Sequence, residues 1–196
     1  MSFKVKDHYY NKAKKENFLA RSVYKLDEID KKHKIIKTGQ RVLDLGYHPG
    51  SWTQYVSDMV GPQGKVVGID IKPVNKKLLT LKNINLFEKD IFDVQAPKDL
   101  GLEEVDVLLS DMAPNTTGIK SVDQIRSLAL VEAVFDFMPR VLRPGGDIVI
   151  KVFDSHQAQD FLKSQKKLFN KLEFLKPKST RSVSKEFFVI GKGYKA

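Results

Sequence analysis

The stretch Val42-Leu-Asp-Leu-Gly-Tyr-His-Pro-Gly-Ser-Trp-Thr-Gln54 decides the fold class of this chain. An apolar run containing Asp44 is followed by a turn rich in glycine and proline, and then by residues that can open a helix. A unit of strand, turn and helix places backbone N–H groups and a carboxylate at one edge of a sheet, where nucleotide-like cofactors bind. Glycine turns after a first strand are common in α/β proteins, so the rest of the chain must decide whether a cofactor binds here.

Strands and helices alternate through the rest of the sequence. The patterns predict strands at 41–45, 65–70, 84–87, 105–110, 147–153, 174–176 and 186–191, and helices at 20–33, 51–59, 122–138 and 155–172. Because such alternation favours parallel strands joined by crossover helices, we expect one α/β domain over residues 1–196, with a mostly parallel sheet and helices on both faces. Within it, we expect residues 1–18 to form a loosely held basic arm and residues 20–196 to form the catalytic core.

Composition excludes several classes of protein. Of the 196 residues, 41% are hydrophobic and 30% charged, as in a globular domain. The sequence contains no cysteine, which excludes disulfides, a cysteine nucleophile and Cys-ligated zinc, and its four histidines show no metal-ligand spacing, so we expect no metal. No apolar run approaches the roughly 20 residues that span a bilayer, and no secretory h-region is present. We therefore expect a cytoplasmic protein without a membrane partner.

The net charge of +10 is concentrated at the two ends of the chain. Residues 1–37 contain 11 Lys/Arg against 5 Asp/Glu, residues 163–196 contain 10 against 2, and residues 38–162 contain 13 against 17. A lysine-rich solvated surface is common, but basic segments flanking a mildly acidic centre favour a protein that grips a polyanion. Nucleic acid is the favoured partner, since no amphipathic anchor supports the alternative of an acidic membrane surface.

Polar residues recur where successive predicted strands end. They are Asp44 and Gly46 after the first strand, Asp70 at the end of the second, Asp90 after the third, Asp111 after the fourth and Lys151 near the end of the fifth. Aspartate after a strand often only caps a turn or helix. The carboxyl ends of parallel strands meet at one edge, however, so the whole set predicts a ligand site there.

The loop chemistry narrows the choice of cofactor. The pattern Gly46-x-x-Pro49-Gly50 differs from the G-x-G-x-x-G of dinucleotide sites, and the chain has no P-loop motif. Proline also lacks the N–H that a pyrophosphate turn would use. A nucleoside without phosphates fits better, with Asp70 meeting the ribose hydroxyls and Asp90 an adenine amino group.

Several motifs, taken in order, resemble one family. They are Asp44-Leu-Gly-x-x-Pro-Gly-x-Trp-x-Gln54, Gly68-Ile-Asp70, Ser110-Asp-Met-Ala-Pro-Asn115, Leu142-Arg-Pro-Gly-Gly146, Ile150-Lys-Val-Phe153 and Lys176-Pro-x-x-Ser-x-Arg-x-x-Ser-x-Glu186. Their order and spacing resemble the FtsJ/RrmJ family of S-adenosylmethionine-dependent RNA ribose 2′-O-methyltransferases. The resemblance implies a single-domain Rossmann-like fold that binds S-adenosyl-L-methionine. It implies cofactor contacts from Asp44, Gly46, Pro49, Gly50, Trp52, Asp70, Asp90, Ile91 and Asp111. Tyr47-His48 stands where many members have two alanines, and leaves the details of those contacts open.

The same resemblance implies a catalytic tetrad of Lys25, Asp111, Lys151 and Glu186. Methyl transfer from a sulfonium to a hydroxyl is an in-line displacement, in which alignment can supply about 7–11 kcal/mol. Lys151 is the candidate to take the hydroxyl proton or to stabilise the developing oxyanion, with Asp111 aligning it. Lys25 and Glu186 would position the ribose. Without the resemblance, Lys25 would be interpreted as an exposed helix lysine and Glu186 as a strand-edge charge.

RNA is the partner that the resemblance implies. We expect the substrate to be a uridine of large-subunit ribosomal RNA, methylated by a monomeric enzyme. The residues expected to contact RNA are Lys12, Lys14, Lys15, Arg21, Lys178, Arg181 and Lys185. The alternatives are 2′-O-methylation of tRNA, a catalytically idle RNA-binding factor in ribosome assembly, and a small-molecule O-methyltransferase.

Overall fold

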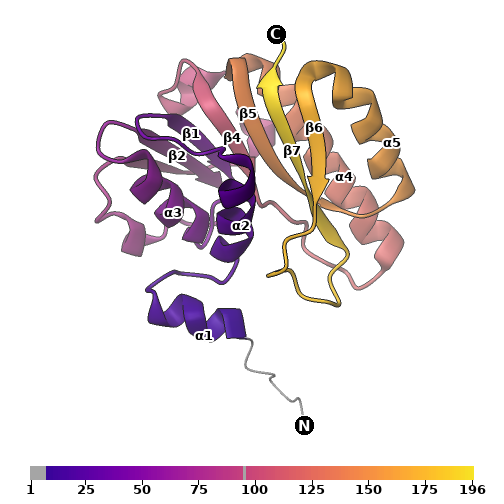
Figure 1. Ribbon diagram of the computed structural model, residues 1–196, viewed down its shortest axis with the longest axis horizontal. Helices are drawn as coiled ribbons and strands as arrows, with labels where there is room; N and C mark the ends of the chain where they lie inside the picture. Colours follow the sequence, from indigo (N-terminus) through magenta and orange to yellow (C-terminus); the bar gives the residue numbers. More distant parts are fainter. Residues whose placement is uncertain (1–7, 95) are drawn as a thin grey trace.

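The described residues form a seven-stranded sheet. The computed structural model describes residues 8–94 and 96–196. The strands are β1 (Arg41–Leu45), β2 (Lys65–Asp70), β3 (Ile84–Glu88), β4 (Val105–Ser110), β5 (Leu142–Phe153), β6 (Phe169–Leu175) and β7 (Glu186–Tyr194), in the order β3-β2-β1-β4-β5-β7-β6. Strands β1 to β5 pair in parallel, and β7 is antiparallel to β5 and β6 (Figure 1). The predicted mostly parallel sheet is therefore confirmed.

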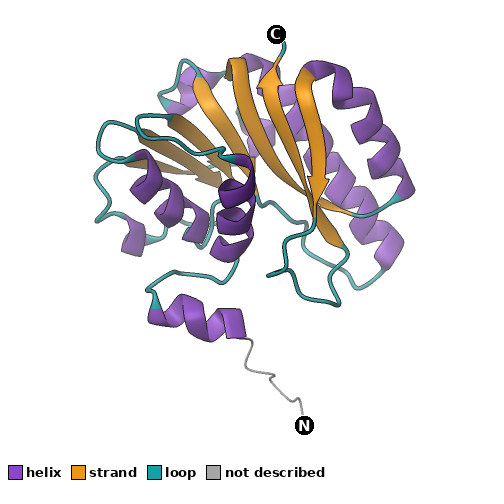
Figure 2. Cartoon of the chain, in the orientation of Figure 1, coloured by secondary structure: helices purple, strands orange, loops and turns teal. Residues whose placement is uncertain are grey.

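Helices cover both faces of this sheet, as predicted (Figure 2). They are α1 (His8–Lys15), α2 (Val23–His33), α3 (Ser51–Val60), α4 (Lys120–Phe137) and α5 (His156–Gln165). Successive strand residues point to opposite faces. Val42 of β1 thus packs in a core with α2 and α3, whereas Leu43 packs in a second core with α4 and α5.

Residues 8–15 are helical, so the predicted loose arm is wrong for this segment. In α1, Ala13 is buried, and it packs with Tyr24 of α2 together with Tyr9 and Phe18. Burial of this small aromatic cluster holds α1 against α2. The first seven residues of the predicted arm lie outside the described part of the chain.

The segment after α5 also differs from the prediction. The structure ends α5 at Gln165, whereas the pattern predicted a helix to residue 172, although Ser155 caps its start as expected by accepting the Ala158 N–H. Phe169 is buried and pairs with Tyr194 across β6 and β7, with ring centroids 5.8 Å apart. The pairing of β6 with β7 overrides the helical pattern and makes the strand longer than the predicted 174–176.

Strand β5 begins five residues before the predicted position because it contains a bulge. Val105 pairs with Leu142 and Val107 with Asp147, so four residues of β5 stand opposite Asp106 alone. The Asp106 carboxylate accepts hydrogen bonds from Arg143 Nε at 2.6 Å and from the Arg41 N–H at 2.7 Å. This charged bond stabilises the Pro-Gly-Gly turn as part of the strand.

The topology directs polar residues to one edge of the sheet. The strand order reverses between β1 and β4, which is where open α/β sheets bind ligands. Helix α1 and the loop between β6 and β7 lie on the side where the parallel strands end (Figure 1). No helix in residues 8–94 and 96–196 is long and apolar enough to cross a membrane.

Candidate active site

The predicted tetrad forms two ion pairs. Lys25 Nζ of α2 pairs with Glu186 Oε1 at the start of β7, and Lys151 Nζ of β5 lies 3.0 Å from Asp111 Oδ1. Lys151 also donates a hydrogen bond to the main-chain carbonyl of Asp111, which follows β4. The side chains of Lys25 and Lys151 are only 13% and 8% exposed. Partners of opposite charge are what permits lysines to be buried to this extent.

Phe188 joins the two pairs. Lys25 Nζ lies 5.8 Å from the centroid of the Phe188 ring, and Phe188 is the direct partner of Lys151 across β5 and β7. Glu186 and Phe188 are two residues apart on β7 and therefore share the face covered by α2. The structure thus brings all four predicted catalytic residues to one end and one face of the sheet.

Asp44 is a buried carboxyl group that is only partly satisfied. Its Oδ2 accepts a hydrogen bond from Thr53 Oγ1 at 2.8 Å, while Oδ1 has no hydrogen-bond partner among the described residues. Burial raises the pKa of Asp44 to about 7; the Thr53 bond opposes this shift, and the carboxylates of Asp111 and Asp70 add to it. Because buried polar atoms in native proteins are normally paired, the free oxygen indicates a site for a ligand donor.

A cleft of about 430 Å³ extends beside Asp111 along the ends of β1, β2 and β4. This volume is in the range of small-molecule sites. Five predicted cofactor residues line it: Gly46, Asp70, Asp90, Ile91 and Asp111. Asp70 accepts the N–H groups of His48 and Lys72 at 3.0 and 2.9 Å, which fixes its carboxylate at the cleft wall.

The other predicted cofactor residues lie differently. Asp44, Pro49 and Trp52 border a smaller cavity that Asp111 also lines. Trp52 is 2% exposed, donates its indole N–H to the Ser22 carbonyl and packs on Phe188. Gly50 lies against Leu78 and borders neither space. Gly50 and Trp52 thus support the loop by packing and lie outside the main cleft, and their contact with the cofactor stays a prediction.

Several cleft residues were missing from the predicted set. Ile71 and Phe92 line the cleft and are 62% and 65% exposed, and α4 contributes Arg126, Ala129 and Leu130. Large exposed apolar side chains beside a cleft suit a flat aromatic ligand. Their positions in the sequence could have identified these two residues, because Ile71 directly follows Asp70 and Phe92 lies two residues after Asp90.

The cleft fits the predicted cofactor. Its carboxylates can accept hydrogen bonds from hydroxyl and amino groups, and the unpaired oxygen of Asp44 can accept one more. Gly46 allows close approach: its φ is +73°, and a Cβ there would lie 2.5 Å from Met112 Cγ. An adenine nucleoside carrying an amino acid matches this set of acceptors. No group of three metal-ligating side chains occurs in the described part of the chain.

The predicted RNA-contacting residues gather on the same side of the molecule. Lys12, Lys14 and Lys15 belong to α1, and Lys178, Arg181 and Lys185 belong to the loop between β6 and β7 (Figure 1). Arg21 joins the two groups, because its guanidinium donates to the Ser179 carbonyl. Burial and the neighbouring Arg181 lower the pKa of Arg21, and Glu186 opposes that shift. Arg21 therefore lies between the basic loop and the active site.

Substitution of Gly46 tests the cofactor cleft. We expect Gly46→Ala to lose most of its affinity for S-adenosylmethionine and about 1–3 kcal/mol of stability, because the new Cβ strains a positive-φ residue and displaces Met112. Gly101→Ala is the matched control, since Gly101 has φ +63° with no atom within 4 Å of the added Cβ. Calorimetric titration and thermal melts measure both effects. Equal cofactor affinity in the two variants would contradict the assignment.

The comparisons with known proteins agree on one family. The model of the FtsJ-like methyltransferase family matches residues 18–194. A relative named ribosomal RNA large subunit methyltransferase E, from Bdellovibrio bacteriovorus, is 46% identical, with 97% of this chain and 98% of that protein covered. A relative of the same name from Syntrophobacter fumaroxidans is 44% identical, with 97% of each covered.

Solved structures share the fold. A ribosomal RNA methyltransferase from Plasmodium falciparum gives a TM-score of 0.78 at 26% identity, covering 90% of this chain and 98% of that one. Fibrillarin from Aeropyrum pernix, solved with bound S-adenosyl-L-methionine, gives 0.62 at 21% identity, covering 87% and 76%. These neighbours confirm the predicted Rossmann-like fold.

The family match confirms the prediction of an S-adenosylmethionine-dependent methyltransferase. It covers the loop around Asp44, both ion pairs and every strand of the sheet. With that coverage, and with relatives more than 40% identical along nearly their whole length, the chain belongs to the FtsJ-like methyltransferase family.

Proposed function

We propose that this enzyme methylates a ribose 2′-hydroxyl of large-subunit ribosomal RNA, at a uridine. The observation that carries the proposal is the pair of buried ion pairs, Lys25–Glu186 and Lys151–Asp111, beside the cofactor cleft. The names of the relatives support the large-subunit RNA as substrate. We further propose that the enzyme acts in the cytoplasm as a monomer.

The cofactor would occupy the cleft at the ends of β1, β2 and β4. Of the residues that line it, Asp70 would accept from the ribose hydroxyls, and Asp90, with Ile91 and Phe92, would hold the adenine. Asp44 and Asp111, which share the smaller cavity, would face the methionine end, where their carboxylates could accept from the amino group. When bound, S-adenosylmethionine supplies a methyl group on a positively charged sulfur, which is already activated for displacement.

The residues of the chain then align the acceptor and handle its proton. The hydroxyl oxygen forms the new bond to carbon while the carbon–sulfur bond breaks, and the bonding electrons go to sulfur. The buried Lys151 amine, held by Asp111, would orient the 2′-hydroxyl oxygen and receive its proton, or stabilise the charge as the proton leaves. Asp111 keeps Lys151 in place, and the Lys25–Glu186 pair positions the ribose.

The alternatives explain fewer of these features. A catalytically idle assembly factor needs neither ion pair, yet both are intact and buried. A small-molecule methyltransferase has no use for the basic residues of α1 and the β6–β7 loop. Methylation of tRNA uses the same chemistry and differs only in the RNA that docks.

Labelling with radioactive S-adenosylmethionine tests the proposal. The purified enzyme is incubated with tRNA, with naked ribosomal RNA and with isolated large subunits from a strain that lacks the modification. We expect label in large-subunit RNA, at one uridine ribose, after nuclease mapping. Label confined to tRNA, or no transfer to any RNA, would overturn the proposed substrate.

A further inference from the structure

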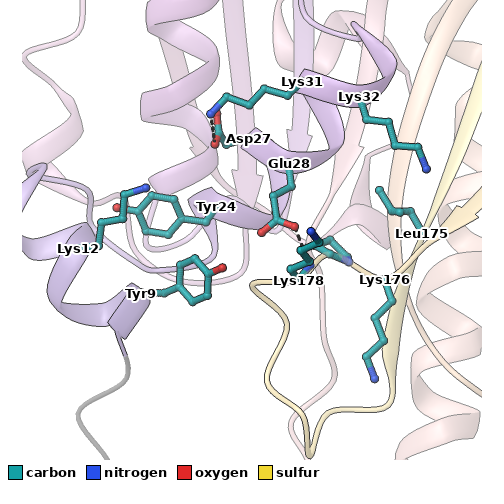
Figure 3. A pocket seen from close by; sticks show the side chains of 11 residues that line it. Tyr9, Lys12, Tyr24, Asp27, Glu28, Lys31, Lys32, Leu175, Lys176 and Lys178 are labelled. Carbon is teal, nitrogen blue, oxygen red and sulfur yellow. Dashed lines mark hydrogen bonds and ion pairs between the residues drawn. The ribbon is translucent and has the colours of Figure 1, made fainter.

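A second cavity, of about 690 Å³, lies outside the cofactor cleft, between α1, α2 and the end of β6 (Figure 3). Five lysines line it: Lys12, Lys31, Lys32, Lys176 and Lys178. We call this cavity the lysine groove. Its lysines come from three separate segments, so the fold, and not a local run of sequence, brings them together.

The acidic residues of the lysine groove are already engaged. Asp27 pairs with Lys31 at 2.7 Å, and Glu28 accepts the main-chain N–H groups of Lys178 and Ser179 at 2.6 and 2.9 Å. Within the described residues, the ammonium groups of Lys32 and Lys178 have no carboxylate at ion-pair distance. The groove therefore carries excess positive charge, which favours an anionic ligand.

Two aromatic rings line the α1 side of the groove: Tyr9, which is partly exposed, and Tyr24, which is 4% exposed and packs against it. The rings of Tyr9 and Tyr24 lie 5.4 Å apart, and Lys12 Nζ lies 4.5 Å from the centroid of the Tyr24 ring (Figure 3). Proteins that bind single-stranded nucleic acid combine a basic groove, which follows the phosphates, with aromatic rings that contact the bases.

Arg21 connects the lysine groove to the active site. Its guanidinium carbon lies 5.4 Å from the centroid of the Tyr9 ring, and the guanidinium donates a hydrogen bond to the Ser179 carbonyl. Burial and Arg181 lower the pKa of Arg21, and the charge of Glu186 opposes that shift. Glu28, which anchors the groove wall, is one helical turn from Lys25. We propose that the lysine groove binds a single-stranded segment of the substrate RNA next to the target nucleotide. This inference rests on the proposed function.

Salt-dependent binding tests the groove. The probe is a fluorescein-labelled oligouridylate of about 12 nucleotides, and the groove variant is Lys32→Gln/Lys178→Gln. Each single-strand phosphate contact contributes about 0.7 to the slope of log affinity against log salt, so we expect the slope to fall by about 1.4. KM for RNA should rise while cofactor affinity stays unchanged. Lys82→Gln/Lys98→Gln removes the same charge from exposed sites elsewhere and should leave the slope as in the wild type.

A second variant tests the partly exposed Tyr9 ring. Tyr9→Leu keeps apolar packing but removes the ring, and stacking of about 1–3 kcal/mol per base predicts a roughly 5- to 150-fold loss of affinity for oligouridylate. Tyr10→Leu, at an exposed neighbour on the same helix, is the control and should bind as the wild type does.

The outcomes separate the two proposals. If the Lys32/Lys178 variant keeps the wild-type slope of log affinity against log salt, the lysine groove is not an RNA-binding site, whichever RNA is methylated. If the wild type methylates no RNA but its binding to oligouridylate depends on the groove residues, the proposed function fails and the groove remains an RNA-binding site.

Discussion

Lys151→Met is expected to lower kcat by about 10²- to 10⁴-fold, the usual contribution of a positioned proton-transfer group, with cofactor affinity changed by no more than a few fold. Lys151 is 8% exposed and is held by both the main chain and the carboxylate of Asp111. Methionine has a similar length and no charge, so it fills the space but can neither take a proton nor stabilise an oxyanion. Single-turnover methylation of RNA at saturating enzyme measures the effect.

Lys192→Met is the matched control. Lys192 also lies on a strand and has an aspartate partner, with Nζ 3.7 Å from Asp147, but it lies at the far end of β7 from Glu186. We expect this variant to keep wild-type kcat. Thermal melts of both variants separate lost catalysis from lost folding, and full turnover by a folded Lys151→Met enzyme would remove Lys151 from the mechanism.

Most of the fold follows from local pattern. Alternating strands and helices predicted the sheet because most of its strands are apolar enough to be recognised alone. The errors arise where distant pairing decides. The interaction of Phe169 with Tyr194 converts the end of a predicted helix into β6, and Asp106 holds the bulge that extends β5. The sequence did not predict helix α1, because a helix with one buried residue, Ala13, shows little apolar periodicity.

The candidate site was less accessible from sequence. Asp44, Asp70, Asp90 and Asp111 could be placed at one edge because each lies at or just after the end of a strand. The pairing of Lys25 with Glu186 joins residues near opposite ends of the chain; the family resemblance placed both in one tetrad, but the ion pair itself was not predicted. The position of Trp52 after the glycine turn suggested a cofactor contact; its ring packs on Phe188 and borders the small cavity beside Asp44, which local sequence could not show.

The lysine groove could not be predicted from the sequence. Lys31, Lys32 and Lys176 look like members of solvated faces when each segment is considered alone. Their common role depends on the docking of α2 against the β6–β7 loop through Glu28, which accepts two N–H groups from residues 150 and 151 positions away. Such a contact has no signature in a single sequence.

Asp44→Asn is expected to change how stability depends on pH. The pKa of Asp44 is raised from 3.8 to about 7 in the folded protein. Between these values the folded state keeps a proton that the unfolded state has lost, so the stability of the wild type falls as pH rises, by up to 1.36 kcal/mol per pH unit. Below pH 4 both states hold the proton, and above pH 7 neither does. Asparagine does not titrate, so the variant should gain roughly 4 kcal/mol relative to the wild type between pH 4 and pH 8.

Chemical denaturation of the two proteins across that pH range measures the difference. Asp136→Asn, which removes an exposed carboxylate from α4, is the control and should follow the wild type at every pH. Parallel stability curves for the wild type and Asp44→Asn would contradict the buried, unpaired state of Asp44.

Cofactor affinity should move in the opposite direction. A hydrogen bond to a charged group contributes about 1.5–3 kcal/mol, so we expect Asp44→Asn to bind S-adenosylmethionine roughly 10- to 100-fold more weakly while it folds more stably at pH 8. A buried carboxylate with an unpaired oxygen destabilises the free protein, and a ligand donor that pairs with that oxygen recovers the loss on binding. Greater stability combined with weaker binding in one variant distinguishes a binding group from a structural one, because removal of a purely structural hydrogen bond would lower stability.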